Sequence, residues 1–229
     1  MHSLTGMTFE KQLLSVNVAE PRRVDYTSAP GSLTGIDKQP VAGPVSITVP
    51  GPKGTGGSAL SGDVIGDKRH HGGHDQAVYA YAREDLDGWG EELGRRLSDG
   101  GFGENFTTRG LNVNGALIGE RWRIGRDVVL EVNSARIPCR TFAGWLRERG
   151  WVKRFTAAAA PGAYLRVIEP GTVKAGDPIE VVHRPDHEVT VSYLFRALTT
   201  SSELLPGILA AGDALHPEAA RRARERRSA

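Results

Sequence analysis

Hydrophobic and polar positions alternate in several short stretches of the chain, a period of two that is typical of half-buried β-strands. The alternation is clear in residues 45–49 (VSITV) and 128–132 (VVLEV). The segment 11–24 also begins as a strand and ends at a turn that contains a proline. Two longer segments, residues 116–139 and 163–185, each predict a strand, a turn and a second strand.

A second pattern, with apolar residues three or four positions apart, predicts helices. It is strongest in residues 75–97, where Asp75 can cap the start of the helix. Residues 141–162, which hold two tryptophans, are also expected to be helical. The last part of the chain predicts three further short helices, over residues 188–198, 201–212 and 216–227.

Turn-forming residues are abundant, with 29 glycines and 13 prolines, which favours many short elements over long helices. The densest run, residues 50–67, is expected to be an exposed, mobile loop, and it lacks the GxxxxGK[ST] spacing of a phosphate loop. Strands without a regular β-α-β order predict an α+β fold, mainly an antiparallel β-barrel with inserted helices. We assign residues 1–184 to this β-barrel domain and residues 185–229 to a short helical C-terminal segment.

Charge and cysteine content exclude several classes of protein. The net charge is only +2, so nucleic acid is not an expected partner, and the basic residues 220–229 are interpreted as a solvated helix end. A single cysteine cannot form an intramolecular disulfide. Residues 1–20 lack the apolar core of a signal peptide, and no stretch approaches the ~20 apolar residues of a membrane span. We therefore expect a cytoplasmic protein without a membrane partner.

The single cysteine, Cys139, follows Pro138 directly and has Arg136 and Arg140 beside it. A thiol acts as a nucleophile or metal ligand only as the thiolate, and neighbouring arginines favour that form. Cys139 is therefore a candidate soft-metal ligand or reactive thiol. The alternative is a buried structural cysteine, which is the commoner role of a lone cysteine.

Three histidines, His70, His71 and His74, surround Gly72 and Gly73. Imidazole groups so close in sequence suggest a zinc, copper or iron site, although the chain lacks the cysteines of a closed structural zinc site. A second interpretation is anion binding, because the glycines let backbone N–H groups approach a ligand where a helix is expected to begin. The third is a histidine-rich surface turn, and the sequence leaves all three interpretations open.

Two other stretches hold candidate ligand-binding residues. In residues 101–111 (GFGENFTTRGL), Asn105 and two threonines can hydrogen-bond a polar ligand, and Gly103 permits its close approach. Lys38, which precedes a predicted strand, can neutralise a phosphate. Taken alone, the same residues are equally compatible with a turn and a solvated lysine.

Three motifs follow one another along the chain: His71-Gly72-Gly73 before an Ala-Val stretch, Gly103-Glu104-Asn105, and Arg136-Ile137-Pro138-Cys139. In this order they resemble the MOSC domain, named for the C-terminal region of molybdenum cofactor sulfurase, and more narrowly the stand-alone bacterial YiiM-type proteins. The likeness covers roughly residues 10–226. The glycine-rich loop is longer than the family pattern, and the other two histidines have no counterpart in that pattern.

The resemblance implies a β-barrel and a molybdenum cofactor, in which a pterin dithiolene with a terminal phosphate holds the metal. It implies that Cys139 supplies a thiolate to molybdenum. Relatives reduce N-hydroxylated compounds such as amidoximes and hydroxylaminopurine-like bases, with electrons from a separate flavin, heme or iron–sulfur protein. The residues that would bind the pterin or its phosphate are Lys38, His71, Gly72, Gly73, Asn105 and Arg136.

We therefore expect a molybdenum-dependent reductase of a small N-hydroxylated substrate, with His71 or His74 as the proton donor. A homodimer is compatible with this expectation. Two other hypotheses fit the same residues. Cys139 can carry a persulfide sulfur, or the protein can deliver the cofactor elsewhere, without turnover of its own. A zinc site at the three histidines is the third hypothesis, and it predicts zinc that is retained after Cys139 is mutated.

Overall fold

The computed structural model describes residues 10–227 and combines many short strands with helices. Its strands are β1 (Gln12–Val18), β2 (Arg22–Arg23), β3 (Leu33–Thr34), β4 (Gln39–Pro40), β5 (Val45–Ile47), β6 (Val78–Ala82), β7 (Phe106–Arg109), β8 (Arg121–Ile124), β9 (Val128–Ala135), β10 (Ala163–Glu169), β11 (Gly171–Val173) and β12 (Ile179–His183). Its helices are α1 (Arg83–Leu93), α2 (Arg140–Leu146), α3 (Trp151–Ala158), α4 (Val191–Thr199) and α5 (Pro217–Arg227), with 3₁₀ segments η1 (Pro30–Ser32), η2 (His74–Gln76) and η3 (Ser202–Ala214). The α+β class predicted from the sequence is confirmed.

Eight strands form one mixed sheet in the order β12-β8-β9-β10-β6-β7-β1-β4, in which β6 and β7 are parallel and the other neighbours antiparallel. The expected β-barrel is wrong, because β12 and β4 are the two edges of this sheet. The start of β1 meets the turn before β12 at an isolated bridge between Gln12 and Pro178, which does not continue as a ladder. Closure needs a continuous ladder between first and last strands, and alternation along a sequence predicts strands without predicting closure.

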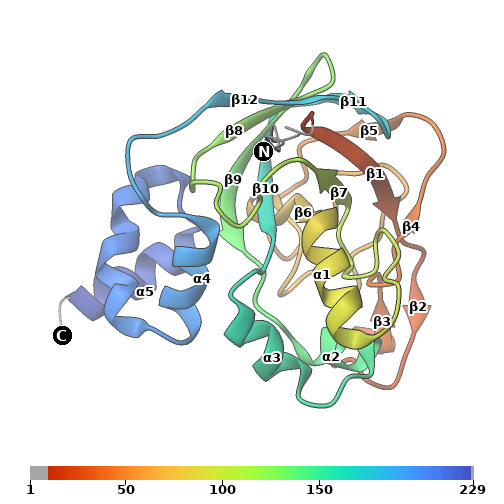
Figure 1. Ribbon diagram of the computed structural model, residues 1–229, viewed down its shortest axis with the longest axis horizontal. Helices are drawn as coiled ribbons and strands as arrows, with labels where there is room; N and C mark the ends of the chain where they lie inside the picture. Colours follow the sequence, from red (N-terminus) through yellow and green to blue (C-terminus); the bar gives the residue numbers. More distant parts are fainter. Residues whose placement is uncertain (1–9, 228–229) are drawn as a thin grey trace, which may run out of the picture.

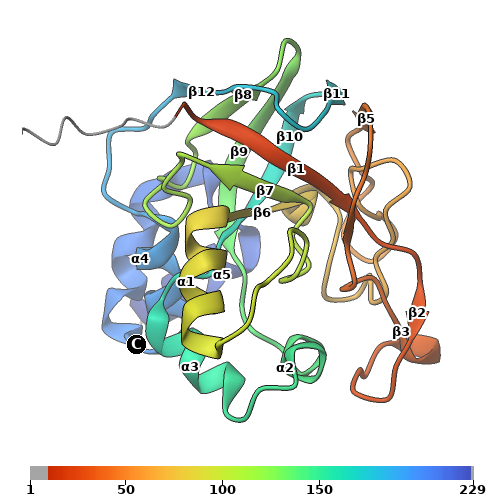
Figure 2. The same ribbon diagram turned by 45° about the vertical axis from the view of Figure 1, so that its right-hand side comes forward.

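The helices gather at two places around the sheet (Figure 1). The C-terminal helices α4 and α5 lie together on one side, where α4 packs against β9. Helices α1, α2 and α3 lie below strands β1, β6 and β7 in Figure 2. An aromatic cluster joins these three helices around one loop residue, with contacting ring centroids 4.7 to 6.4 Å apart; its members are Trp89, Phe102, Phe142, Trp151 and Phe155. The cluster therefore fixes α2, the helix that begins directly after Cys139.

The helix predicted over residues 75–97 is correct only in its second half. Residues Val78–Ala82 form strand β6, and helix α1 begins at Arg83. All five residues of β6 are buried, because the strand lies inside the sheet between β10 and β7. A strand buried on both faces is apolar throughout and does not show a period of two. Its neighbour β7 lies in a stretch that the sequence predicts only as turns.

Other predicted segments are divided into helices and strands differently in the structure. Residues 141–162 form two helices because Arg147 and Gly150 adopt left-handed conformations between them. The segment 163–185 holds three strands instead of two, and the middle one of the three C-terminal helical segments is a 3₁₀ segment. The division of the chain near residue 185 stays a prediction. Within residues 10–227, no helical segment combines the length and apolarity needed to cross a bilayer.

Candidate functional site

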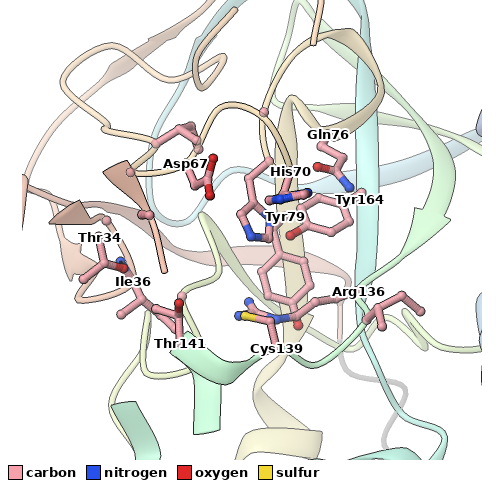
Figure 3. Close-up of a pocket in the computed structure, with 18 of the residues that line it drawn as sticks. Thr34, Ile36, Asp67, His70, Gln76, Tyr79, Arg136, Cys139, Thr141 and Tyr164 are labelled. Carbon is pink, nitrogen blue, oxygen red and sulfur yellow. Dashed lines mark hydrogen bonds between the residues drawn. The ribbon is translucent and has the colours of Figure 1, made fainter. Parts of the chain in front are cut away.

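A cavity of about 410 Å³ opens beside the end of β9, between loops from the first half of the chain and helix α5. Figure 3 shows Cys139 and Arg136 close together on one side of it, with Asp67 and His70 on the opposite side. The structure brings together six of the seven residues that the sequence singles out for cofactor binding: Lys38, His71, Gly72, Asn105, Arg136 and Cys139. The seventh, Gly73, is not among the residues that line the cavity.

Cys139 lies in the short connection between β9 and α2. Strand β9 ends at Ala135, and Pro138 cannot donate a ladder hydrogen bond, so the chain leaves the sheet here. Cys139 has extended backbone angles and occupies the cap position before α2, where its carbonyl oxygen accepts the N–H of Ala143 at 3.0 Å. The residue is half-buried and lines the cavity. A ligand in the cavity can therefore reach a thiol whose backbone is held by the start of a helix.

Arg136 is buried, with 6% of its surface exposed, and it lines the same cavity. One guanidinium nitrogen donates to the carbonyl oxygen of Phe102 at 2.7 Å, and the guanidinium carbon lies 4.2 Å from the ring centre of Phe142 and 5.0 Å from that of Tyr79. Within residues 10–227 no carboxylate forms an ion pair with it. The cavity wall thus carries a fixed positive charge that protein acids leave unneutralised, and this favours an anionic ligand.

The pKa of Arg136 is consistent with a cation held in place. Burial on its own would lower this pKa, but the pKa is raised because Tyr79, Tyr164 and Cys139, in their ionised forms, favour the guanidinium cation.

Lys38 forms a buried ion pair with Asp63; 5% of the lysine side chain and none of the aspartate side chain is exposed. The same carboxylate accepts the amide of Asn105 at 2.9 Å and the backbone N–H of Ala19 at 2.9 Å. Asn105 also accepts the backbone N–H of Tyr79 at 3.2 Å. Burial lowers the pKa of Lys38, while Asp63 opposes that change. The positive charge of Lys38 is therefore already balanced, and both predicted ligand-binding side chains also brace the sheet.

Glu104, the middle residue of the Gly-Glu-Asn motif, stabilises the loop that supports Arg136. Its fully buried carboxylate accepts the backbone N–H groups of Gly100 at 2.6 Å and Phe102 at 2.9 Å, and the hydroxyl of Thr107 at 2.9 Å. Burial raises its pKa to about 7, against the effect of these three hydrogen bonds. The sequence gives no signal of this role, because it shows the motif only as a polar turn.

The three histidines of residues 70–74 lie differently relative to the cavity. His71 is partly buried and lines it, whereas His70 is exposed at its rim and His74 is exposed and does not line it. Burial, reinforced by the nearby Arg136 cation, lowers the pKa of His71 to about 4, so its ring is neutral at pH 7. No group of three His, Cys, Asp or Glu side chains in the described part of the chain could hold a metal ion, so the zinc hypothesis is wrong.

The two glycines of this turn serve close packing. Gly72 and Gly73 both have φ of +77°, a left-handed region that favours glycine. A Cβ atom on Gly72 would lie 2.8 Å from the carbonyl oxygen of Gly57, and one on Gly73 would lie 2.6 Å from the backbone nitrogen of Lys53. The N–H of Gly73 donates to Gly57 at 3.1 Å. The turn therefore packs against the glycine-rich loop, which explains why both segments need small residues.

The sequence analysis does not identify several of the residues that line the cavity. Gln76 belongs to a segment predicted as a surface helix, and Tyr164 appears only as one alternating position of a strand. His216 and Arg222 come from the C-terminal segment, which the sequence separates from the candidate site. Their place in the cavity depends on how α5 packs, and no local sequence signal reports it.

The comparisons with known proteins point to one family. The family model described as MOSC domain matches residues 67–180. The chain is 31% identical over 184 residues to the uncharacterized protein YflK of Bacillus subtilis (strain 168), an alignment that covers 80% of this chain and 79% of that protein. This chain belongs to the MOSC domain family. The resemblance inferred from the sequence motifs is thereby confirmed.

Two further similarities refine the place of this MOSC protein in the family. The crystal structure of YiiM from Geobacillus stearothermophilus matches it with a TM-score of 0.75 at 25% identity, covering 94% of this chain and 98% of that chain. A protein named Reductase from Gibberella moniliformis (strain M3125 / FGSC 7600) is 30% identical over 151 residues, which is 62% of this chain. That alignment covers only 27% of the Gibberella protein. Within the MOSC family, this chain is therefore similar to the YiiM-type proteins.

Proposed function

We propose that this MOSC protein is a molybdenum-cofactor-dependent reductase of small N-hydroxylated compounds, of the hydroxylaminopurine or amidoxime class. The observation that carries the proposal is the position of Cys139 beside Arg136 on one cavity wall, a thiol next to a buried cation without an acidic partner in the described residues. Membership of the MOSC family supports a role connected with the molybdenum cofactor. The similarity to a protein named Reductase supports a reduction.

The chemistry of the residues fits that cofactor. Molybdenum accepts soft ligands, and a thiolate is the softest ligand that a protein offers, so one cysteine is sufficient without a second cysteine. The pterin dithiolene and its phosphate are anionic, and Arg136 supplies a positive charge that no described carboxylate neutralises. In this proposal Cys139 holds the metal through its thiolate, and Arg136 binds the anionic part of the cofactor.

The other proposed contacts act through hydrogen bonds more than through charge. Lys38 and Asn105 remain proposed cofactor contacts, and their shared partner Asp63 limits their movement. Gly72, which lines the cavity, allows the turn beside His71 to approach the ligand closely, and Gly73 stays a proposed contact that acts through the packing of this turn. His71 is the proton donor expected from the sequence, but with a pKa of about 4 its ring is neutral at pH 7. In this proposal His71 therefore acts as a hydrogen-bonding ring in the cavity.

The overall reaction consumes two electrons and two protons. The cofactor, when bound, supplies the two-electron reduction that breaks the N–O bond. The substrate becomes the corresponding amine or amidine, and its oxygen leaves as water. The electrons come from a separate flavin, heme or iron–sulfur protein. The chain's own residues hold the cofactor, exclude bulk water and orient the substrate.

The proposal is tested on protein made in a host that synthesises the molybdenum cofactor. Reduced methyl viologen replaces the electron-donor protein, and benzamidoxime and 6-hydroxylaminopurine are the substrates. We expect wild-type turnover of at least one substrate, loss of turnover in Cys139→Ser, and retained turnover in the neighbouring conservative variant Thr141→Ser. A Cys139→Ser variant with full activity would contradict the proposal.

A sulfur-carrier function is the alternative, and the partial exposure of Cys139 favours it, because an exposed thiol can take the outer sulfur of another protein's cysteine persulfide, which is left as a thiol. It predicts one additional sulfur atom on the peptide that contains Cys139, measured by mass spectrometry. It also predicts no turnover of N-hydroxylated substrates by molybdenum-loaded protein.

A further inference from the structure

The C-terminal segment contributes one wall of the cavity that holds Cys139. His216, directly before helix α5, lines the cavity together with residues of α4 and α5. On the sheet side the same cavity is lined by Gln76 of η2 and Tyr164 of β10, which lie side by side in Figure 3. The segment therefore completes the cavity that the MOSC motifs begin.

Two of the residues that line this part of the cavity each have a buried polar atom without a hydrogen-bond partner in the described residues. His216 is 8% exposed, and its Nε2 atom is buried without a hydrogen bond in the described residues. The Oε1 atom of Gln76 is also buried and unpaired there. Leaving a buried polar group unpaired is unfavourable, so such groups beside a cavity point to a ligand that satisfies them.

The hydrogen bonds of the ring identify what His216 offers to a ligand. Its Nδ1 atom accepts the backbone N–H of Glu218 at 3.2 Å. A neutral imidazole has one acceptor nitrogen and one N–H, so the proton is on Nε2, which is a donor. The Oε1 atom of Gln76 is an acceptor. Two residues that line the cavity thus carry one unpaired donor and one unpaired acceptor.

We propose that His216 and Gln76 are specificity-determining residues that bind the nitrogen edge of a neutral planar amidoxime or amino-substituted heterocycle. Such an edge, N–C=N, carries an acceptor nitrogen for His216 and an N–H donor for Gln76. The inference deepens the proposed function, since an amidoxime and a hydroxylaminopurine both carry this edge. It gives the C-terminal segment a role in substrate choice.

The structure offers a matched control for His216. His187 has the same local hydrogen bond, in which Nδ1 accepts the backbone N–H two residues later at 3.1 Å, but it does not line this cavity. His216→Phe and His187→Phe therefore lose the same local bond, and only the first loses the donor in the cavity. His216→Gln restores an N–H donor, and Gln76→Met removes the acceptor at nearly constant volume.

The experiment measures binding and turnover separately on molybdenum-loaded protein. Calorimetry with adenine and, in the absence of a reductant, with benzamidoxime reports binding without chemistry, and a KM and kcat series reports the reaction. We expect His216→Phe and Gln76→Met each to weaken binding and raise KM about tenfold, the effect of one hydrogen bond to a ligand. kcat and the molybdenum content should change little, His216→Gln should recover part of the affinity, and His187→Phe should bind like wild type.

The inference is overturned if His216→Phe binds both probes as wild type does, if wild type binds neither probe, or if His187→Phe is weakened equally. Failure of the reductase proposal looks different. In that case wild type turns over no N-hydroxylated compound, while the difference between His216→Phe and His187→Phe in probe binding persists.

Discussion

The buried carboxyl of Glu104 makes the stability of this protein depend on pH in a way that one substitution isolates. The side chain is fully buried and faces three hydrogen-bond donors, yet burial raises its pKa from 4.5 to about 7. Glu104→Gln keeps the size of the side chain and removes its titration. The substitution should therefore remove one contribution to the pH dependence and leave the others in place.

The sign follows from where the proton is held. Between pH 4.5 and about 7 the folded protein keeps a proton on Glu104 that the unfolded chain has released, so stability falls as pH rises through this window. The contribution is fully present below pH 4.5 and lost above about pH 7. At about 1.4 kcal/mol per pKa unit, it corresponds to about 3 kcal/mol.

The assay is urea unfolding of wild type and Glu104→Gln at pH 4.5, 6 and 8. We expect the wild-type free energy of unfolding, minus that of the variant, to decrease by about 3 kcal/mol across this range. Other titrating groups, such as His71, cancel in the difference. The exposed variant Glu203→Gln controls for the loss of one carboxylate and should show no such decrease. A difference that stays level or increases with pH would refute the reasoning.

Two further predictions concern the residues that brace the cavity. Lys38→Met leaves Asp63 buried without its cation, so we expect the free energy of unfolding, measured with urea, to fall by about 3–5 kcal/mol. Adding Asp63→Asn should restore part of this loss. A fall below about 1 kcal/mol would contradict the buried ion pair. Gly73→Ala should lower the free energy of unfolding by more than about 2 kcal/mol. The position has φ +77° and ψ −177°, and a Cβ atom there would clash with Lys53. Gly54→Ala, which has positive φ but open space, should cost less, and equal losses would rule out the clash.

Local patterns predict many of the elements but not how the sheet ends. Strands are correctly predicted on both sides of the turn at 125–127, although only β8 alternates between more exposed and buried positions, whereas all eight residues of β9 are buried. Residues Val78–Ala82 mimic a helix, because a strand buried on both faces carries no alternation. Closure into a barrel depends on pairing between strands far apart in sequence, so the expectation of a barrel had no local basis.

The candidate site shows the same division between local and long-range information. Cys139 and Arg136 belong to one short motif, and the structure brings both to one cavity. The sequence does not reveal that the charge of Lys38 is balanced by Asp63, which lies 25 residues further along the chain. His216 could not be predicted at all, because only the packing of the C-terminal helices brings it to the cavity.

The proposal that Cys139 holds molybdenum is tested most directly by metal analysis. Wild type and Cys139→Ser are purified from a host that makes the molybdenum cofactor, and molybdenum and zinc are measured per chain. We expect about one molybdenum per wild-type chain, a marked loss of molybdenum in the variant, and no stoichiometric zinc in either. Equal molybdenum in both proteins, or none in wild type under conditions that load another molybdoenzyme, would contradict the proposed site.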